Sequence, residues 1–304
     1  MIRQRLSLRV EPPFELAVVA FGHGWIDLAP NVWEPERGVL RTAAGVDGQP
    51  TDLSIHQSGD RLLVATRSTR RSPPSSIRRV VQRMLRLDED MSEWWALCKC
   101  HPDFDWVARR GAGRLLRAPT LFEDLLKLLL TTNCSWAATR GMVDRLVTQL
   151  GETTPSGARA FPLPERCARK SERFFRHEIR AGYRSGPLRE LARRAVRGAL
   201  VDLDDPEAST DALRARLLAL PGFGPYATGQ ALRLLGRYED LALDSWCRAK
   251  LTERAGGRAL SDTAIARRYA RYGRFRGLVL WVDLTRSWHE GPIAAPLSAA
   301  PRTS

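Results

Sequence analysis

Residues 220–244 read LPGFGPYATGQALRLLGRYEDLALD and combine two groups that could do chemistry. Gly222 and Gly224 lie between two helical patterns, and without a Cβ they let an anion approach backbone N–H groups at the start of the second helix. Asp244 stands immediately before SWCRAKL, in N-cap position, where helix N–H donors stabilise its negative charge. The spacing predicts a carboxylate beside a phosphate-binding turn. The alternative is a tight helix connection followed by a simple cap.

A second candidate position lies at Asn133. In PTLFEDLLKLLLTTN, Thr120 can cap a helix and Glu123 can complete a capping box, so we expect a helix to about Thr131. Ser135 is the next cap, for a helix ended by a glycine at position 151. Asn133 is therefore predicted at the tip between two helices, where a helix-break cap is its alternative role.

The patterns on either side predict an α+β fold. A β-rich N-terminal domain with its linker covers residues 1–76, and a mostly helical domain covers 77–290. The strands are expected within 14–30, 38–46, 51–59 and 60–68, the linker at 67–76, a last helix or helix pair opening at Ser261, and a disordered tail at 291–304.

The charge favours a polyanionic partner. Lys and Arg number 48 against 34 acidic residues, a formal net charge of +14, and only four of the 48 are lysines. A GC-rich coding bias and a phosphate-binding role explain the arginines equally well. No apolar run reaches the length of a membrane span and the N-terminus lacks a signal-peptide core, so we expect no membrane partner.

The five cysteines form no C-x-x-C pair. Disulfide frameworks, zinc sites and four-cysteine iron–sulfur motifs are therefore not predicted, and we expect a reduced, cytoplasmic protein associated with the nucleoid. No metal site is predicted.

The motifs together resemble a known family. LPGFGPYATGQAL followed by LALDSWCR is similar to the helix-hairpin-helix, Gly/Pro-rich loop and Asp motif (HhH-GPD) of the DNA glycosylase superfamily. Residues 104–151 are similar to the stretch of 8-oxoguanine glycosylases in which an Asn turn precedes GMV, and residues 181–196 to that family's GYR helix. The resemblance covers most of the chain and suggests the branch that combines 8-oxoguanine and 3-methyladenine (alkyladenine) glycosylases.

The resemblance implies specific roles. Asp244 would be the catalytic carboxylate, and Gly222, Phe223 and Gly224 the phosphate-binding hairpin. Asn133 would fill the space left by a nucleotide flipped out of damaged double-stranded DNA. These roles suit the chemistry, because a base must leave the stack before its N-glycosidic bond is attacked, and an anion stabilises the sugar cation that forms.

One departure bears on mechanism. In bifunctional members, a Lys that forms a Schiff base with the sugar occupies the position of Tyr226, and Lys250 is a poor substitute for that Lys. Tyr226 is also a candidate for DNA binding. We therefore expect a monofunctional, hydrolytic DNA glycosylase of base excision repair, acting as a monomer. The alternatives are a bifunctional 8-oxoguanine glycosylase/AP lyase and a non-catalytic helix-hairpin-helix DNA-binding protein. No cofactor is expected, because the iron–sulfur cysteines found in part of the family are absent after Asp244. A structural monovalent cation bound at the hairpin is the one possibility that the sequence leaves open.

Four residues are candidates for the base pocket: Tyr226, Gln230, Trp246 and Trp136. Gln230 and Trp246 stand where 8-oxoguanine glycosylases have Cys and His, so that specificity does not transfer. An aromatic pocket suits cationic, alkylated purines, and the expected substrate is an alkylated or oxidised purine. A core role is the alternative for Trp136, and the GHGW stretch at 22–25 is a further candidate for the pocket wall.

Overall fold

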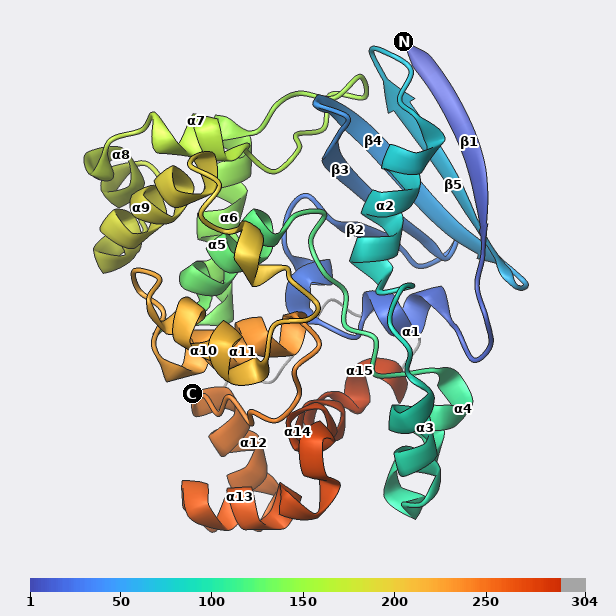
Figure 1. The fold of residues 1–304 in the computed structure, drawn as a ribbon, viewed down its shortest axis with the longest axis vertical. Coiled ribbons are helices and arrows are strands. Elements are labelled where there is room, and N and C mark those ends of the chain that lie inside the picture. Colours follow the sequence, from blue (N-terminus) through green and yellow to red (C-terminus); the bar gives the residue numbers. More distant parts are fainter. Residues whose placement is uncertain (291–304) are drawn as a thin grey trace.

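The computed structural model describes residues 1–290 and has the expected α+β fold (Figure 1). Within those residues five strands form one antiparallel sheet in the order β1-β5-β4-β3-β2. The strands are β1 (Ile2–Arg9), β2 (Val32–Glu34), β3 (Val39–Val46), β4 (Gln49–Ser58) and β5 (Arg61–Ser68). The tail predicted at 291–304 lies outside the described residues, and the domain bounds at 76 and 290 stay predictions.

The N-terminal prediction was partly wrong. The run at 14–30 is not a strand: it forms the short helix α1 (Leu16–Ala20) and the 3-10 helix η1 (Gly24–Asp27). LAVVA is apolar throughout and almost wholly buried, and such a run has no periodicity that separates strand from helix. The edge strand comes instead from residues 2–9, where Leu8 pairs with Leu62 of β5.

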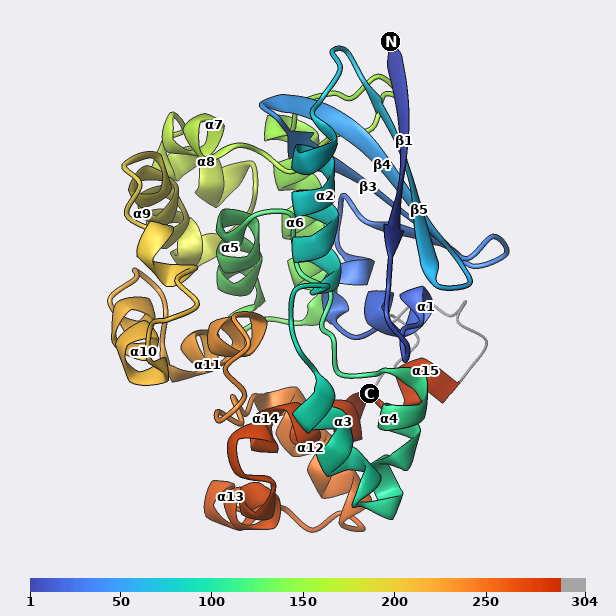
Figure 2. The same cartoon turned by 45° about the vertical axis from the view of Figure 1, so that its right-hand side comes forward.

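The predicted linker at 67–76 is shorter in the structure. The strand β5 continues to Ser68, and α2 (Pro74–Leu85) begins six residues later. Gln4 holds the connection in place, because its amide donates to the carbonyl of Ser72 and accepts from the Ser72 N–H, each at 2.9 Å. The helix α2 lies along the sheet (Figure 2), so this segment is a tight connection.

Helices fill the rest of the described chain. They are α3 (Ser92–Lys99), η2 (Pro102–Phe104), α4 (Asp105–Arg110), α5 (Leu121–Thr131), α6 (Trp136–Leu150), α7 (Pro164–Ala168), α8 (Glu172–His177), η3 (Gly182–Arg184), α9 (Ser185–Val196), η4 (Val201–Leu203), α10 (Thr210–Leu218), α11 (Pro225–Leu234), α12 (Ser245–Arg254), α13 (Asp262–Tyr269), η5 (Ala270–Phe275), α14 (Arg276–Thr285) and α15 (Ser287–Glu290). None of these helices is both long and apolar enough to cross a membrane.

The predicted helix starts at 120, 135 and 261 are confirmed. Thr120, Ser135 and Ser261 each accept a hydrogen bond from a backbone N–H three residues on. The second half of the capping box is wrong, because the Glu123 carboxylate accepts from buried Lys127 at 2.6 Å instead of turning back to the cap. An unpaired ammonium in the interior costs more free energy than an exposed N-cap N–H that water can solvate, so the Glu123 carboxylate pairs with Lys127.

The helix α5 is the centre of the helical part and positions the site. It packs against α6, α9 and α11, and its residues from 122 to 130 are buried. Buried Asp124 joins it to the N-terminal part, since its Oδ1 accepts from the Trp25 indole and from the Ala118 N–H, both at 2.8 Å. Arg83 of α2 donates to its other oxygen at 3.3 Å. Two distant segments, at Trp25 and Arg83, thus converge on one carboxylate.

Candidate active site

The turn between α10 and α11 is tight, as predicted, but only Gly222 of its two glycines has a positive φ, since Gly224 is extended with φ of −88°. Gly222 has φ of +79°, which favours glycine, and a Cβ there would come within 2.9 Å of Leu129 and 3.0 Å of Pro187. Gly224 differs, because a Cβ at that position would meet nothing within 4 Å. The positive φ and the close packing thus both favour glycine at 222, whereas the space around Gly224 at the start of α11 is open.

Phe223 places its side chain in the core, and its expected contact with DNA stays a prediction. Its side chain is buried, and its N–H donates to the carbonyl of Leu220 at 3.1 Å. It therefore anchors the hairpin to the core, and any contact it makes with DNA is limited to its backbone.

Asp244 is the N-cap of α12, as predicted. Its Oδ1 accepts from the Cys247 N–H at 2.7 Å, and its carbonyl accepts from the Arg248 N–H at 3.1 Å. The side chain is half-buried. One hydrogen bond therefore fixes the carboxylate while part of it stays accessible.

The loop that delivers Asp244 passes between two helices at points where glycines make room. A Cβ on Gly229 of α11 would lie 2.8 Å from the Ala242 Cβ, and one on Gly277 of α14 would lie 2.0 Å from the Asp240 carbonyl oxygen. Ala242 itself has φ of +47°, a conformation that costs an L-residue about 1–2 kcal/mol. Close packing on both sides holds the loop in this path.

The buried guanidinium of Arg233 ties this loop to α11. It donates to the Gln230 Oε1 at 2.9 Å and to the carbonyl of Leu241 at 2.8 Å. Gln230 in turn donates to the carbonyl of Ala242 at 3.3 Å. Both ends of the Gln230 amide are thus engaged in holding the loop, although sequence reasoning assigned Gln230 to the base pocket.

Tyr226 begins α11 beside Asp244. Burial is the largest cause that raises the pKa of its phenol, and the negative charge of Asp244 raises it further. Burial, with the same carboxylate as a second cause, raises the pKa of the Cys247 thiol to about 12. Both groups therefore stay neutral near pH 7.

Aromatic rings extend from Asp244 into the interior. The Trp246 ring lies 6.4 Å from that of Trp281 on α14, and both lie within 6.0 Å of the Trp288 ring, measured between centroids. His23 is 5.4 Å from Trp281 and 4.4 Å from Trp25. The GHGW stretch therefore does reach this cluster.

His23 and Arg233 border the cluster, the first as a neutral group and the second as a cation. Burial lowers the pKa of His23 to about 3, and the charges of Arg233 and Lys127 lower it further, so the imidazole is neutral. The Arg233 guanidinium carbon lies 5.2 Å from the centre of the Trp281 ring. A buried positive charge therefore sits against the aromatic surface.

Asn133 occupies the tip between α5 and α6, as predicted, and is exposed. Its φ is +46°, which asparagine tolerates, and its amide donates to the Tyr183 hydroxyl at 3.1 Å. Arg184 donates to the Asn133 carbonyl at 3.1 Å and to that of Thr132. Neighbouring side chains thus hold the tip in a fixed conformation.

Trp136 lies apart from Asp244. Its indole donates to Asp27 at 2.7 Å, and its ring packs against the backbone of Gly24, where a Cβ would come within 2.8 Å. It reaches the aromatic cluster only through the 22–25 turn. This contact agrees with the structural role that the sequence left open.

Sequence reasoning missed three residues of this region: Trp281, Arg233 and Tyr183. Tyr183 is 57% exposed beside Asn133, and its GYR motif was a signal that could have singled it out. Trp281 and Arg233 lie on amphipathic helices, where an aromatic or basic residue carries no signal of its own. Among residues 1–290 no group of three or more His, Cys, Asp or Glu side chains could hold a metal ion.

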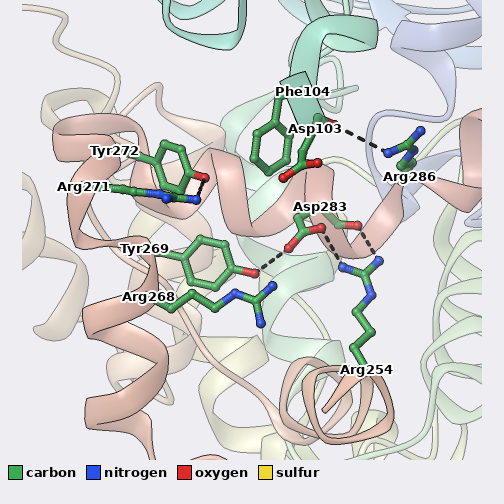
Figure 3. A pocket seen from close by; sticks show the side chains of 9 residues that line it. All are labelled: Asp103, Phe104, Arg254, Arg268, Tyr269, Arg271, Tyr272, Asp283 and Arg286. Carbon is green, nitrogen blue, oxygen red and sulfur yellow. Dashed lines mark hydrogen bonds and ion pairs between the residues drawn. The ribbon is translucent and has the colours of Figure 1, made fainter. Parts of the chain in front are cut away.

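A pocket elsewhere in the structure shares none of these residues. It lies where η2 and the C-terminal end of α12 meet α13, η5 and α14 (Figure 3).

No family model and no curated protein matches the sequence. The fold is similar to that of MBOgg1, solved in complex with a low-affinity DNA ligand, with a TM-score of 0.72, 18% identity, and coverage of 95% of this chain and 100% of the other. It is also similar to the 3-methyladenine DNA glycosylase of Archaeoglobus fulgidus, with a TM-score of 0.72, 19% identity, and coverage of 94% and 99%.

A third similar structure is the 8-oxoguanine glycosylase/lyase of Clostridium acetobutylicum in complex with double-stranded DNA containing cytosine opposite 8-oxoG. Its TM-score is 0.71 at 15% identity, and the coverage is 95% of this chain and 98% of the other. The chain therefore has the fold of 8-oxoguanine and 3-methyladenine DNA glycosylases over nearly its whole length.

The loop path predicts opposite signs for one substitution at two helical glycines. Gly229→Ala should lower the free energy of unfolding by about 1–3 kcal/mol, because the added Cβ overlaps Ala242. Gly186→Ala in α9 should be neutral or raise it by up to about 1 kcal/mol, because its nearest neighbour would lie at 3.5 Å and Ala favours helix. Urea unfolding measures both. Equal effects at the two sites would contradict the close packing of the loop.

Proposed function

We propose that this protein is a monofunctional DNA glycosylase that flips a damaged purine out of double-stranded DNA and hydrolyses its N-glycosidic bond. The observation that carries the proposal is the position of Asp244. Its carboxylate accepts a hydrogen bond from the Cys247 N–H at 2.7 Å and is half-buried. The open glycine turn precedes α11, and Asp244 caps α12, the helix that comes next in the chain. A fixed anion beside a phosphate-binding turn suits reaction at a deoxyribose.

The proposed chemistry uses water as the nucleophile. As the bond between C1′ and the purine nitrogen lengthens, the sugar gains oxocarbenium character and the Asp244 carboxylate stabilises that positive charge. Water then adds to C1′ and loses a proton, and the base leaves with the electron pair of the broken bond and takes up a proton. The products are the free base and an abasic site.

Binding is assigned to the surfaces on either side of Asp244. The N-terminal turn of α11 at Gly224 would hold a backbone phosphate without reading sequence. Asn133 would enter the space left by the flipped nucleotide, and exposed Tyr183, which accepts its hydrogen bond at 3.1 Å, would support it. We also propose that the protein acts as a monomer in the cytoplasm.

The hydrolytic assignment rests on Tyr226. A phenol cannot form a Schiff base with the sugar, and burial and Asp244 raise its pKa, so it remains neutral. Two lysines that could be considered as the amine of a Schiff base have other partners. Lys250, which follows Asp244 in the sequence, pairs with Glu253 at 2.9 Å, and buried Lys127 pairs with Glu123 at 2.6 Å.

The charge of Arg233 supports a neutral, oxidised purine over a cationic, alkylated one. The aromatic cluster alone would suit cationic bases, but one of its rings, Trp281, already carries the guanidinium at 5.2 Å. A second positive charge against the same ring would be repelled by this guanidinium. A purine with a carbonyl oxygen and no net charge avoids this repulsion.

A hydrolytic enzyme should give no covalent adduct with its substrate under borohydride. Lesion-containing duplex is incubated with the protein and sodium borohydride and analysed on a denaturing gel, with base release scored in parallel. Base release without an adduct is expected. An adduct would instead favour the bifunctional glycosylase/AP lyase, because reduction traps only a Schiff base.

The substrate is tested with duplexes carrying 8-oxoguanine, hypoxanthine, 7-methylguanine, 3-methyladenine or uracil, scored for base release under single-turnover conditions. We expect the neutral 8-oxoguanine or hypoxanthine to be released at least about tenfold faster than the cationic 7-methylguanine and 3-methyladenine. Faster release of the cationic bases would assign the site to alkylated purines. Binding of these duplexes with no release of any base would favour the non-catalytic DNA-binding protein.

A further inference from the structure

A pocket of about 310 Å³ opens at the C-terminal end of α12, away from the candidate active site (Figure 3). Because α12 spans ten residues at ~1.5 Å per residue, this end of the helix lies roughly 15 Å from Asp244. The pocket is lined by Asp103, Phe104, Arg254, Arg268, Tyr269, Arg271, Tyr272, Asp283 and Arg286. Arginine is the most frequent residue type in this lining.

The negative charge of Asp283 is already matched. Its Oδ1 accepts from Arg254 at 2.6 Å and its Oδ2 accepts from the Tyr269 hydroxyl at 2.5 Å. The Arg254 guanidinium also donates to the Asp283 carbonyl at 2.7 Å. This carboxylate therefore neutralises one arginine of the pocket and leaves the others in excess over Asp103.

Arg268 and Arg271 contribute charge that aromatic rings hold in place. Arg268 lies 5.8 Å from the centre of the Tyr269 ring, and Arg271 lies 4.9 Å from the Tyr272 ring and donates to the Tyr272 hydroxyl at 2.8 Å. Within residues 1–290 neither arginine forms an ion pair with a carboxylate closer than 4 Å. Both side chains are exposed.

The sequence places these pairs at a regular spacing. RRYARYGRF repeats an arginine followed by an aromatic residue every three positions, at 268, 271 and 274. Arg268 belongs to α13 and Arg271 to the start of η5, whose path bends at Gly273, where φ is +53°. Arg274 follows that bend and pairs with Glu93, so Arg268 and Arg271 are the two arginines of this repeat that line the pocket.

The rings support the arginines and offer little surface to a ligand. Tyr269 is 1% exposed and Tyr272 is 5% exposed, so a base has no free ring to stack on. Guanidinium groups bind phosphate oxygens through paired N–H donors, whatever base is attached. The pocket thus has the properties of a site for a phosphate group and not for a base.

We infer that this pocket binds a phosphate group, held mainly by Arg268 and Arg271, at a site separate from the one proposed for base excision. The ligand is the phosphate of a nucleic-acid backbone or a free phosphate. The inference does not depend on the proposed glycosylase activity, because none of the lining residues belongs to the candidate active site.

The test compares the purified full chain with Arg268→Gln/Arg271→Gln. The control is Arg3→Gln/Arg5→Gln, which removes two exposed arginines from the edge strand β1 and lowers the net charge equally. The thermal unfolding midpoint is followed against inorganic phosphate, with sodium chloride at matched ionic strength. Phosphate should raise the midpoint of the parent and of the control, and the pocket variant should lose most of that rise.

Two further arms identify the source of the phosphate. If the ligand is a nucleic-acid backbone, affinity for an undamaged duplex should fall at least about fivefold in the pocket variant, with a shallower salt dependence. If it is free phosphate, that affinity should be unchanged while the phosphate effect is still lost. Equal protection of parent and pocket variant by phosphate would overturn the inference. Equal protection of the parent by succinate would also overturn it, since the site would then not prefer phosphate.

Discussion

The Asp244 carboxylate can lie beside the hairpin only because the loop before it passes between α11 and α14 at very close range. Gly229 and Gly277 remove the two side-chain positions that would block this path. Arg233 then holds the loop from within, through the Gln230 amide and the carbonyl of Leu241. The glycine turn at 222–224 and the carboxylate are thereby connected through one packed unit, and a shift of that loop would move the carboxylate.

The interior around this unit is unusually charged for a protein core. Arg233, Asp124, Lys127 and Glu123 are all buried, and each has a partner of opposite charge or a backbone group at hydrogen-bond distance. Buried ions of this kind are costly unless paired, so they fix geometry more than they add stability. Asp124 joins α5 to the GHGW turn and to α2, and Arg233 joins α11 to the loop that precedes Asp244. The same charges leave the aromatic cluster next to a cation, which is why we propose a neutral base as substrate.

Local signals in the sequence predicted the parts of the site that depend on local structure. Asp244 as the N-cap of α12, the glycine turn at 222–224 and the position of Asn133 follow from capping and turn chemistry within a few residues. Local signals did not indicate the roles of Gln230 and Phe223, because these roles depend on tertiary packing. The Gln230 amide holds a loop residue that lies twelve positions later in the sequence, and the Phe223 side chain is buried. The strand at residues 2–9 was missed and the run at 14–30 misread for the same reason, since pairing and burial decide both. Trp281 is brought to Trp246 only by tertiary packing.

The central claim is that the charge of Asp244, and not its capping bond, drives base release. Asp244→Asn keeps the shape and a good N-cap, so unfolding free energy should change by at most about 1 kcal/mol. Single-turnover base excision, measured alongside binding of lesion-containing duplex, is the most direct test. The account predicts that excision falls on the order of a hundredfold or more while the duplex still binds, because the lost interaction is strongest in the transition state. Excision by Asp244→Asn at the parent rate would contradict it and leave the carboxylate as a helix cap.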